Sequence, residues 1–432
     1  MKFYSTRDRN YCVSFEDAVK IGLAPDGGLF MPESIRVMPK QYLESISNKS
    51  FAETSFDVAS NFLNGSIPEN ELRKIIDRTI SFDTPLVEIE QGVFSLELYH
   101  GPTFAFKDLG ARFLSGLLGY FAKRQNDKAT VLVATSGDTG SAVANGFFNV
   151  PGTRVIVLYP SGKVSDIQEK QFTTLGGNIT AIEIDGTFDD CQSLVKQAFA
   201  EATLKKNLSL TSANSINIAR LLPQSFYYFN AFAQLKDRNL PLVFSVPSGN
   251  FGNLTAGVLA KRMGLPVDQF IAATNINDIV PKYLKTGIFS PRTSVSTLSN
   301  AMDVGYPSNF ARLMDLYESD LKRISKDIRG AHFTDDETSQ AIRDVFFSRN
   351  YLLDPHGAIG YLGLKDYLIS NPPCNGIFLE TAHPGKFKDV VENSIGQSIP
   401  LPEGLTKFLI GEKKSVQMSN SFEDFRSYLM KL

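Results

Sequence analysis

The sequence predicts an α/β protein in which helices cover both faces of parallel β-sheets. From about residue 86 onward, short apolar and β-branched runs alternate with helical stretches. Runs such as VIVLY at 155–159 are apolar throughout, which is typical of strands buried on both faces. The length of 432 residues leaves room for two or three domains with a large core.

The expected strands and helices form consecutive pairs along the chain. Strands are predicted at 130–134, 154–159, 179–184, 242–246, 270–274 and 376–381, and helices at 109–120, 141–148, 166–175, 189–200 and 254–263. The uncharged segment Leu242 to Ala260 contains proline, glycines and asparagines, which predict a strand, a turn and a helix and not a membrane span.

Three regions are expected along the chain. Residues 1–82 are predicted to form an N-terminal helical unit, in which Ser14 caps a helix and residues 25–28 (PDGG) make a turn. Residues 83–400 should form the core, with a small subdomain at about 112–170 and a large subdomain in the remainder. Residues 401–432 are expected to be a tail with one or two helices.

Composition and charge exclude several classes of protein. The net charge is −2 and the basic residues are scattered, which argues against nucleic acid or an anionic membrane as a partner. Three dispersed cysteines and four dispersed histidines show neither a disulfide framework nor metal-ligand spacing, so we expect no metal and a reducing, cytoplasmic location. The N-terminal segment MKFYSTRDRNYCVSFEDA lacks the apolar core of a signal peptide.

Lys107 is the most informative single residue. It ends the segment HGPTFAFK, behind aromatic and apolar residues and just before a predicted helix. Desolvation in such a pocket lowers the pKa of a lysine, and a neutral amine can form the Schiff base on which pyridoxal phosphate enzymes depend. The alternative is an ordinary lysine whose stem packs under aromatic rings while its head reaches water.

Two glycine-rich loops each follow a predicted strand and open a helix. The first is TSGDTGS at 135–141 and the second is PSGNFGN at 247–253. In a parallel sheet both loops would lie at the carboxyl ends of strands, where ligands bind. Each could hold a phosphate or carboxylate with backbone N–H groups at a helix N-terminus; the alternative is a tight turn without a ligand.

Two further segments carry candidate polar groups. In SANSINIAR at 212–220, amide and hydroxyl side chains precede Arg220, which could complete a clamp for an oxyanion or could be a surface arginine on a capped helix. In ETAHPGKFK at 380–388, the hydroxyl of Thr381 at a strand end could bond a ring nitrogen. His383 precedes a proline and is expected to be structural.

Taken together, these segments resemble the threonine synthase family of fold type II pyridoxal phosphate enzymes, in the branch found in bacteria and fungi. The resemblance covers nearly the whole chain. It rests on FEDAVKIGLAPDGGLFMPE, HGPTFAFKDLG, ATSGDTGSAVA, LGGNITAIEIDGTFDDCQ, SANSINIARLLPQ, VPSGNFGNLTAG, AATNINDIVPKYL, TLSNAMDV and TAHPGKF.

The resemblance implies a carbon–oxygen lyase that converts O-phospho-L-homoserine and water to L-threonine and phosphate. It also implies roles for particular residues. Lys107 would carry the pyridoxal 5′-phosphate and act as the catalytic base, the cofactor phosphate would be held by Gly249, Asn250, Phe251, Gly252 and Asn253, and Thr381 would face the pyridine nitrogen. The substrate phosphate would contact Thr139, Asn214, Ser215 and Arg220, and the substrate carboxylate would lie near Ser136 and Gly137.

Asp138 departs from the pattern of the fold, because relatives usually have asparagine beside the 3′-oxygen of the cofactor. A carboxylate there would repel the phenolate unless it is turned away or protonated. We also expect the smaller subdomain to close over the site, and the protein to be a monomer or a homodimer.

Two other functions are compatible with part of this pattern. A serine or threonine dehydratase of the same fold would stop after elimination, but it needs no clamp for a substrate phosphate, so the segment ending at Arg220 disfavours it. A related binding protein without catalysis is disfavoured by the presence of Lys107 and of both glycine-rich loops.

Overall fold

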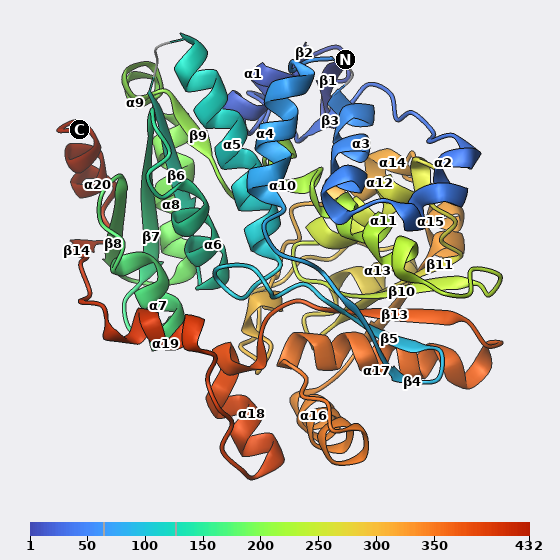
Figure 1. Cartoon of the computed structure of the whole chain (residues 1–432). Coiled ribbons are helices and arrows are strands. Elements are labelled where there is room, and N and C mark those ends of the chain that lie inside the picture. The colour runs from blue at the N-terminus through green and yellow to red at the C-terminus, as the bar shows by residue number, and fades with distance from the viewer. Residues whose placement is uncertain (64, 126–127) are drawn as a thin grey trace.

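Two parallel β-sheets lie side by side in the computed structural model, each with helices packed on its faces (Figure 1). The structure describes residues 1–63, 65–125 and 128–432. Helix α5 (Lys107–Gln125) runs between the sheets, and the N-terminal unit lies against both subdomains. The predicted α/β class with parallel sheets is confirmed.

The larger sheet has six strands, and all neighbouring pairs are parallel except the edge pair β4–β5. Its centre is apolar and fully buried, as the continuous hydrophobic runs predict. The order is β12 (Ile328–His332), β11 (Gln269–Thr274), β10 (Leu242–Pro247), β13 (Asn375–Glu380), β5 (Val93–Glu97) and β4 (Leu86–Glu90).

The smaller sheet has five strands, all parallel to their neighbours. The order is β14 (Val416–Ser419), β8 (Ile179–Asp185), β7 (Thr153–Pro160), β6 (Ala129–Ala134) and β9 (Leu210–Ser212). This sheet reaches well beyond the 112–170 range expected for the small subdomain, because the strand–helix alternation continues to β9 and the C-terminal tail adds β14 at its edge.

The five helices predicted for the core are present within a few residues of their expected limits, as α5, α6 (Asp138–Phe147), α7 (Asp166–Thr173), α8 (Phe188–Ala200) and α12 (Gly252–Arg262). The core also contains helices that were not predicted: α9 (Ala202–Leu208), α10 (Ile218–Leu221), α11 (Gln224–Gln234), α13 (Ile279–Thr286), η2 (Asn300–Met302), α14 (Phe310–Leu316), α15 (Leu321–Asp327), α16 (Asp335–Arg349), α17 (Pro355–Ser370), η3 (Pro384–Phe387) and α18 (Lys388–Ile395). The segment 242–260 folds as a strand, a turn and a helix, as expected.

The N-terminal unit is not purely helical, which corrects the expectation for residues 1–82. Besides α1 (Phe15–Ile21), α2 (Lys40–Ser45), η1 (Ile46–Asn48), α3 (Phe51–Leu63) and α4 (Glu69–Thr79), it contains an antiparallel sheet of β1 (Lys2–Ser5), β2 (Cys12–Ser14) and β3 (Phe30–Pro32). These strands are too short to show an alternating pattern, and β3 pairs with β1, from which β2 and α1 separate it in the sequence. The side chain of Ser14 caps α1, as predicted.

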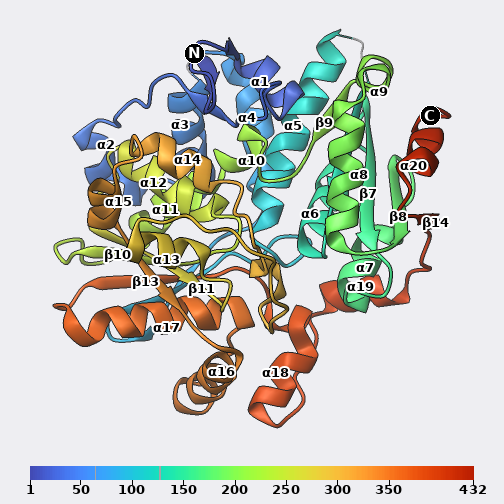
Figure 2. The same ribbon diagram turned by 180° about the vertical axis from the view of Figure 1, so that it is seen from behind.

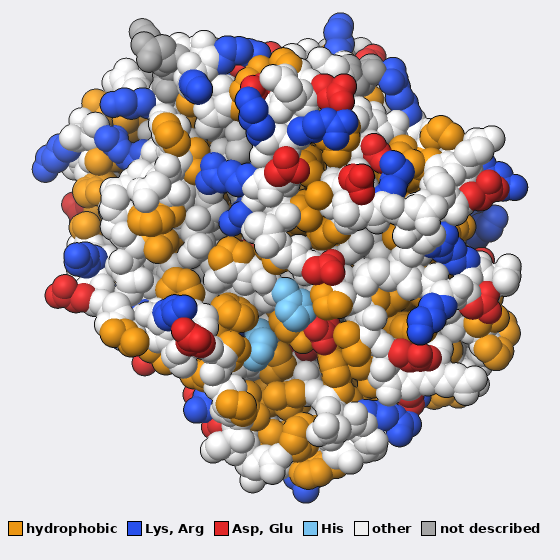
Figure 3. Space-filling view, viewed as in Figure 1, with side chains coloured by type: hydrophobic (Ala, Val, Ile, Leu, Met, Phe, Trp, Pro, Cys, Tyr) orange, Lys and Arg blue, Asp and Glu red, His pale blue; other side chains and the backbone are white. Residues whose placement is uncertain are grey.

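The C-terminal tail spans the two subdomains. After α18 the chain runs through α19 (Glu403–Ile410), which packs on α7, and then forms β14 and α20 (Phe422–Leu429) at the outer edge of the smaller sheet (Figure 2). On the face seen in Figure 3, basic side chains are dispersed among acidic ones. Among the described residues, no helix has the length and apolar character needed to cross a membrane.

Candidate active site

The candidate site lies at the carboxyl ends of strands in both sheets, where an open cleft of about 1480 Å³ separates the subdomains. Three of the residues predicted to bind ligands, Asn214, Ser215 and Asn250, line this cleft. The amide of Asn214 donates to the carbonyl oxygen of Ala134 at 3.1 Å, so residues 212–220, the segment predicted to bind the substrate (the substrate segment), are held against the end of β6. Asn250 belongs to the second glycine-rich loop, Ala134 at the cleft directly precedes the first, and the charge of Asp138 in the first loop acts on Lys107.

Lys107 is the first residue of α5 and is half-buried. Its loop is tethered to the end of β13, because Phe106 N–H donates to Thr381 O at 2.9 Å and Ala105 pairs with Ala382. Phe104 has a left-handed backbone (φ 58°), a conformation that costs a bulky residue about 1–3 kcal/mol. The loop before Lys107 therefore has a strained backbone at Phe104 and is anchored to the chain that follows β13.

The surroundings of Lys107 favour its neutral form. Burial lowers the pKa of the Lys107 amine below its ordinary value; the carboxylate of Asp138 opposes this shift, while the charges of Lys386 and Arg220 add to it. The ring of Phe106 lies 5.8 Å from Nζ. Burial of the amine agrees with the desolvation expected from the sequence, but the charges of Asp138, Lys386 and Arg220 make this pocket polar and not purely apolar.

The second glycine-rich loop connects β10 to α12 and forms a cradle at the helix N-terminus. Phe251 caps α12 with a left-handed backbone (φ 60°). A Cβ atom added at Gly252 would meet its nearest protein atom, Asn309 Nδ2, at 3.5 Å, which is an ordinary contact. Packing within the protein therefore does not require glycine at 252, because a Cβ atom there would make only ordinary contacts with Asn309 and Gln224.

The cradle is braced by the segment that precedes α14. Asn309 N–H donates to Asn250 O and Ser308 N–H donates to Asn250 Oδ1, both at 3.2 Å. A Cβ at Gly249 would lie 2.8 Å from Met302 Cα, so glycine is required there for close packing. The side chain of Asn253 donates to Pro247 O at 2.7 Å, so this amide holds the turn together.

The first glycine-rich loop, between β6 and α6, is held by Thr135. The N–H groups of Gly137 and Gly140 donate to its Oγ1 at 2.9 and 2.8 Å. Gly137 has φ 142°, and a Cβ there would lie 2.5 Å from Gln168 Oε1, so a side chain is excluded. Ser136 and Thr139 flank this turn and are half-buried at the start of α6.

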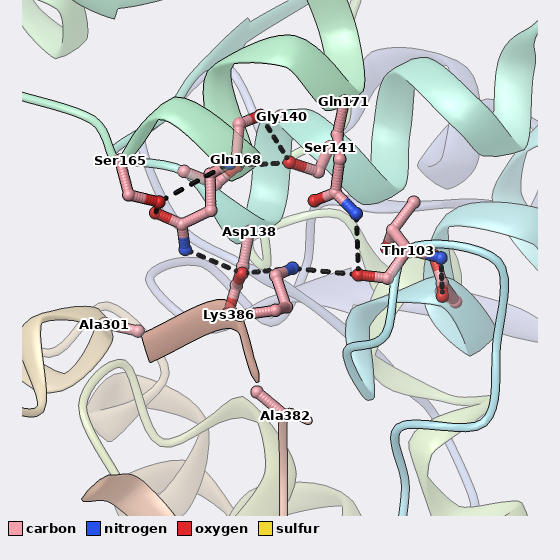
Figure 4. Close-up of polar contacts among 12 residues, drawn as sticks. Thr103, Asp138, Gly140, Ser141, Ser165, Gln168, Gln171, Ala301, Ala382 and Lys386 are labelled. Atoms are coloured by element: carbon pink, nitrogen blue, oxygen red, sulfur yellow. Dashed lines mark hydrogen bonds and ion pairs between the residues drawn. The ribbon is translucent and has the colours of Figure 1, made fainter. Parts of the chain in front are cut away.

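The negative charge of Asp138, in the first turn of α6, is stabilised by two donors from other elements (Figure 4). Lys386 Nζ lies 2.6 Å from Asp138 Oδ1, and Gln168 Nε2 donates to the same oxygen at 2.9 Å. Burial raises the pKa of Asp138, but the charges of Lys386 and Lys107 and these two hydrogen bonds together hold it well below its usual range. The two donors favour the ionised form of Asp138 over the protonated alternative considered from the sequence.

Lys386 and Gln168 are site residues that the sequence did not reveal. The Lys386 side chain is completely buried, and its Nζ also donates to Thr103 O at 2.9 Å. Its position shortly after His383 resembles that of any lysine in a polar turn, so no local pattern identifies it. Asp108, next to Lys107, accepts from the N–H and hydroxyl of Thr103 at 2.8 and 2.6 Å, and burial raises its pKa to about 6.

Arg220 is buried and lacks an acidic partner. It retains only 4% exposure, its guanidinium donates to Ala213 O, and its Nε has no hydrogen-bond partner. Burial lowers its pKa to about 10, so it stays protonated at neutral pH. No carboxylate in the described parts of the chain forms an ion pair with it. A buried cation in this state is a good binding group for an anion, and the alternative of a surface arginine is wrong.

A second buried arginine supports the substrate segment. Arg312 is fully buried and donates to Ser215 O at 3.1 Å, to Ile216 O at 2.7 Å and to Phe30 O of the N-terminal unit. It also donates to Asn309 Oδ1 at 2.7 Å. This arginine joins the N-terminal unit, the substrate segment and the brace of the cradle, and the sequence did not single it out.

Thr381 follows the end of β13 and is buried beside the Lys107 loop. The preceding carboxyl, Glu380, points instead toward α17, where a Cβ atom at Gly357 would collide with its Oε2. Burial raises the pKa of Glu380 far above its ordinary value, and the nearby Asp354 adds to this effect. His383 caps η3 by accepting from Gly385 N–H at 3.0 Å, in agreement with the structural role expected for it.

Three family models cover this chain almost completely. "Threonine synthase N terminus" matches residues 2–80, "Pyridoxal-phosphate dependent enzyme" matches 79–371, and "Threonine synthase, C-terminal" matches 357–429. The chain belongs to the threonine synthase family. Membership makes it a lyase of the threonine synthase type that depends on pyridoxal phosphate.

Individual relatives agree with the family models. The threonine synthase of Haemophilus influenzae is 45% identical with full coverage of both chains, and that of Escherichia coli is 46% identical over 94% of each. The crystal structure of Escherichia coli threonine synthase superposes with a TM-score of 0.94 at 44% identity and full coverage of both chains. A pyridoxal phosphate-bound threonine synthase from Brucella melitensis gives the same TM-score at 35% identity, covering 100% of this chain and 99% of that one.

More distant enzymes share only the fold. A threonine deaminase from Solanum lycopersicum matches with a TM-score of 0.56 at 17% identity, covering 85% of this chain and 97% of that chain. This match confirms the fold type II architecture that was expected.

The residues at the site fit pyridoxal phosphate. An amine whose protonation is disfavoured lies at Lys107, and the open cradle before Gly252 offers N–H groups and a helix dipole to a phosphate. Thr381 offers a neutral hydroxyl next to the Lys107 loop, whose Phe106 N–H donates to the Thr381 carbonyl oxygen. The site thus supplies the covalent, anionic and polar contacts that the cofactor requires.

Lys107→Ala should abolish covalent attachment of pyridoxal phosphate, and the wild-type amine should react at a pH where an ordinary lysine is almost fully protonated. The sign follows from burial, which favours the neutral amine, so attachment should continue below the ordinary lysine pKa of about 10.4. Borohydride reduction followed by peptide mapping checks both points. Label on Lys163, Lys261 or Lys386 would contradict the assignment.

Gly252→Val should weaken cofactor binding while leaving the fold intact, and Gly252→Ala should do so to a smaller extent. The added atoms would occupy the space in front of the cradle, where the protein makes only ordinary contacts. We expect at least a tenfold rise in the dissociation constant for pyridoxal phosphate, equivalent to about 1.4 kcal/mol. Equilibrium titration of the apoenzyme measures it, with thermal unfolding as the control. Full cofactor occupancy at limiting supply would show that the loop is assigned wrongly.

Proposed function

We propose that this chain converts O-phospho-L-homoserine and water to L-threonine and phosphate. The observation that carries the proposal is the buried guanidinium of Arg220, which forms no ion pair with a carboxylate of the described residues and whose Nε has no hydrogen-bond partner there. The cradle at α12 accounts for the cofactor phosphate, so a second cationic group beside the cleft is best explained by a second phosphate, that of the substrate. Asn214, Ser215 and Thr139 supply neutral donors for the same group.

The other end of the substrate is assigned to the first glycine-rich loop. We place the substrate carboxylate near Ser136 and Gly137, at the N-terminus of α6, where backbone N–H groups and the helix dipole favour an anion. Gly249, Asn250, Phe251 and Asn253 shape the cradle for the cofactor phosphate, together with Gly252. Thr381 is assigned to the pyridine nitrogen as an uncharged contact.

When bound, pyridoxal phosphate supplies a conjugated ring that can delocalise the negative charge formed at the α-carbon of an amino acid. Lys107 would hold the cofactor until the substrate amine replaces it. The released amine, kept neutral by its buried surroundings, would then remove the proton from Cα and return a proton at the end of the reaction. Its anchoring at the start of α5 keeps it within reach of these atoms.

Arg220 would act on the leaving group. As the bond between Cγ and the phosphate oxygen breaks, charge accumulates on the phosphate, and a desolvated guanidinium stabilises that charge more strongly than a hydrated one. A proton is lost from Cβ as the phosphate leaves Cγ, water then adds its hydroxyl at Cβ, and protons are returned to Cγ and Cα. Because water must enter only at this stage, we propose that the subdomain with the smaller sheet closes against the core during turnover.

The two alternative functions are supported less well. A dehydratase of the same fold has no substrate phosphate to neutralise, which would leave Arg220 as a buried charge without purpose. A binding protein without catalysis would not need the electrostatic environment of Lys107.

We further infer a cytoplasmic protein, monomeric or homodimeric, organised as the N-terminal unit, the core and the tail. Its three cysteines are unpaired, which suits a reducing compartment.

Purified holoenzyme should release inorganic phosphate from O-phospho-L-homoserine and form L-threonine in equal amount. Colorimetric phosphate assay and chromatographic identification of the amino acid test this directly. Release of phosphate with a 2-oxo acid and ammonia as products would instead indicate elimination without hydration, and would contradict the proposal.

Arg220→Ala should sharply reduce kcat/KM for O-phospho-L-homoserine while leaving the absorbance of the bound cofactor unchanged. A hydrogen bond to a charged group contributes about 1.5–3 kcal/mol, which corresponds to roughly a ten- to hundredfold loss. Arg220→Lys should restore only part of it, because an ammonium cannot reproduce the planar fork of donors. Loss of cofactor in Arg220→Ala with unchanged kinetics after reconstitution would refute the role.

A further inference from the structure

Lys386 connects three segments of the site that come from different parts of the chain. Its own turn follows β13 of the larger sheet, its partner Asp138 begins α6 beside the smaller sheet, and its third contact, Thr103 O, lies in the loop that leads to Lys107 (Figure 4). The ammonium is fully buried and lies 2.6 Å from the carboxylate and 2.9 Å from the carbonyl. No step proposed for the reaction makes use of it.

The charges around Lys107 come from four elements. Asp138 on α6, Lys386 in η3 and Arg220 on α10 all act on the Lys107 amine, and Asp108 beside it on α5 interacts with both Lys386 and Arg220. Asp138 and Lys386 have opposite effects on Lys107: the carboxylate favours the protonated amine, and the ammonium favours the neutral amine. The salt bridge therefore places a nearly balanced pair of charges next to the reactive lysine.

We propose that Lys386 is a positioning residue that acts through Asp138: it turns this carboxylate toward the large subdomain and balances its negative charge, so that Lys107 can remain a neutral base. The proposal rests on the assignment of Lys107 as the cofactor-carrying lysine. Without Lys386, Asp138 would keep the hydrogen bond from Gln168 and would have Lys107 as the remaining ammonium group that stabilises its charge.

The pair also explains why a buried carboxylate is tolerated beside the reactive lysine. The single negative charge of Asp138 is matched by the single positive charge of Lys386, and both side chains are almost completely removed from water. Gln168 donates to the same oxygen as Lys386, so the orientation of the carboxylate is defined by two donors from different elements. A phenolate oxygen brought near this pair would meet a neutral group and not a net negative charge.

The test is the pH dependence of cofactor capture by the apoenzyme, measured as the rate at which absorbance of the Schiff base appears after addition of pyridoxal 5′-phosphate. Lys386→Met should move the midpoint of this rate upward by about one pH unit or more, because an unpaired carboxylate favours the protonated amine. Asp138→Asn should move it downward, because the opposing effect of Lys386 remains. Lys386→Met combined with Asp138→Asn should lie between the two single variants.

The opposite signs distinguish this role from a purely structural one. If the Lys386–Asp138 salt bridge only held the loops together, both single variants would capture the cofactor more slowly without opposite shifts of the midpoint. That result would overturn the proposal. Shifts in the same direction would also overturn it. Lys388→Met is the matched control, since it removes a nearby lysine whose contact is a surface pair with Glu392 at 3.6 Å, and its midpoint should equal that of the wild type.

Two safeguards keep the outcome interpretable. If Lys386→Met does not fold, as judged by circular dichroism and thermal unfolding, the downward shift of Asp138→Asn still tests the electrostatic part, and an unchanged midpoint there refutes it. Lys107→Ala separates this proposal from the assignment on which it rests. Covalent capture that persists in Lys107→Ala would disprove the role of Lys107, whereas capture by Lys107 with an unshifted midpoint in the Lys386 and Asp138 variants would disprove only the role of Lys386.

Discussion

Buried charge is the constraint on which the rest of this site depends. Where the two parallel sheets meet, the chain removes Asp138, Lys386, Arg220 and Arg312 almost completely from water. Each such ion costs several kcal/mol unless a partner compensates it. Asp138 and Lys386 compensate each other, and Arg312 is surrounded by carbonyl and amide oxygens. Arg220 is compensated least, with an Nε that lacks any partner. Asp138, Lys386 and Arg312 are therefore groups that hold the site together, whereas Arg220 is available to a ligand.

The N-terminal unit takes part in this arrangement and is more than an appendage. Phe30 O at the start of β3 accepts from Arg312, whose other donors fix the carbonyls of the substrate segment and the side chain of Asn309. Asn309 in turn braces the cradle through Asn250. One fully buried guanidinium thus couples the N-terminal sheet to both proposed phosphate sites. Such coupling explains physically why the N-terminal region and the pyridoxal phosphate core form one compact unit in this family.

Backbone geometry at the loops divides the glycines into two groups. Gly137 and Gly249 are required by the protein itself, since an added Cβ would lie within 2.8 Å of neighbouring atoms. Gly252 is not, because its nearest neighbour would be 3.5 Å away. A glycine that packing does not demand, placed at the first turn of a buried helix, is best explained by the approach of a ligand. This distinction is invisible in the sequence, where all three residues occur in similar loops.

The sequence by itself determined the α/β class, six strands and five helices of the core, the two glycine-rich turns and the special position of Lys107. These features depend on local information: hydrophobic runs, turn residues and the spacing of a motif. Only the tertiary structure decided the pairing of Asp138 with Lys386, the burial of Arg220 and Arg312, the sheet in the N-terminal unit and the addition of β14 to the smaller sheet. The partners in these contacts lie far apart along the chain, and neither the charge state of a carboxyl nor the exposure of an arginine is defined until such distant segments meet and exclude water.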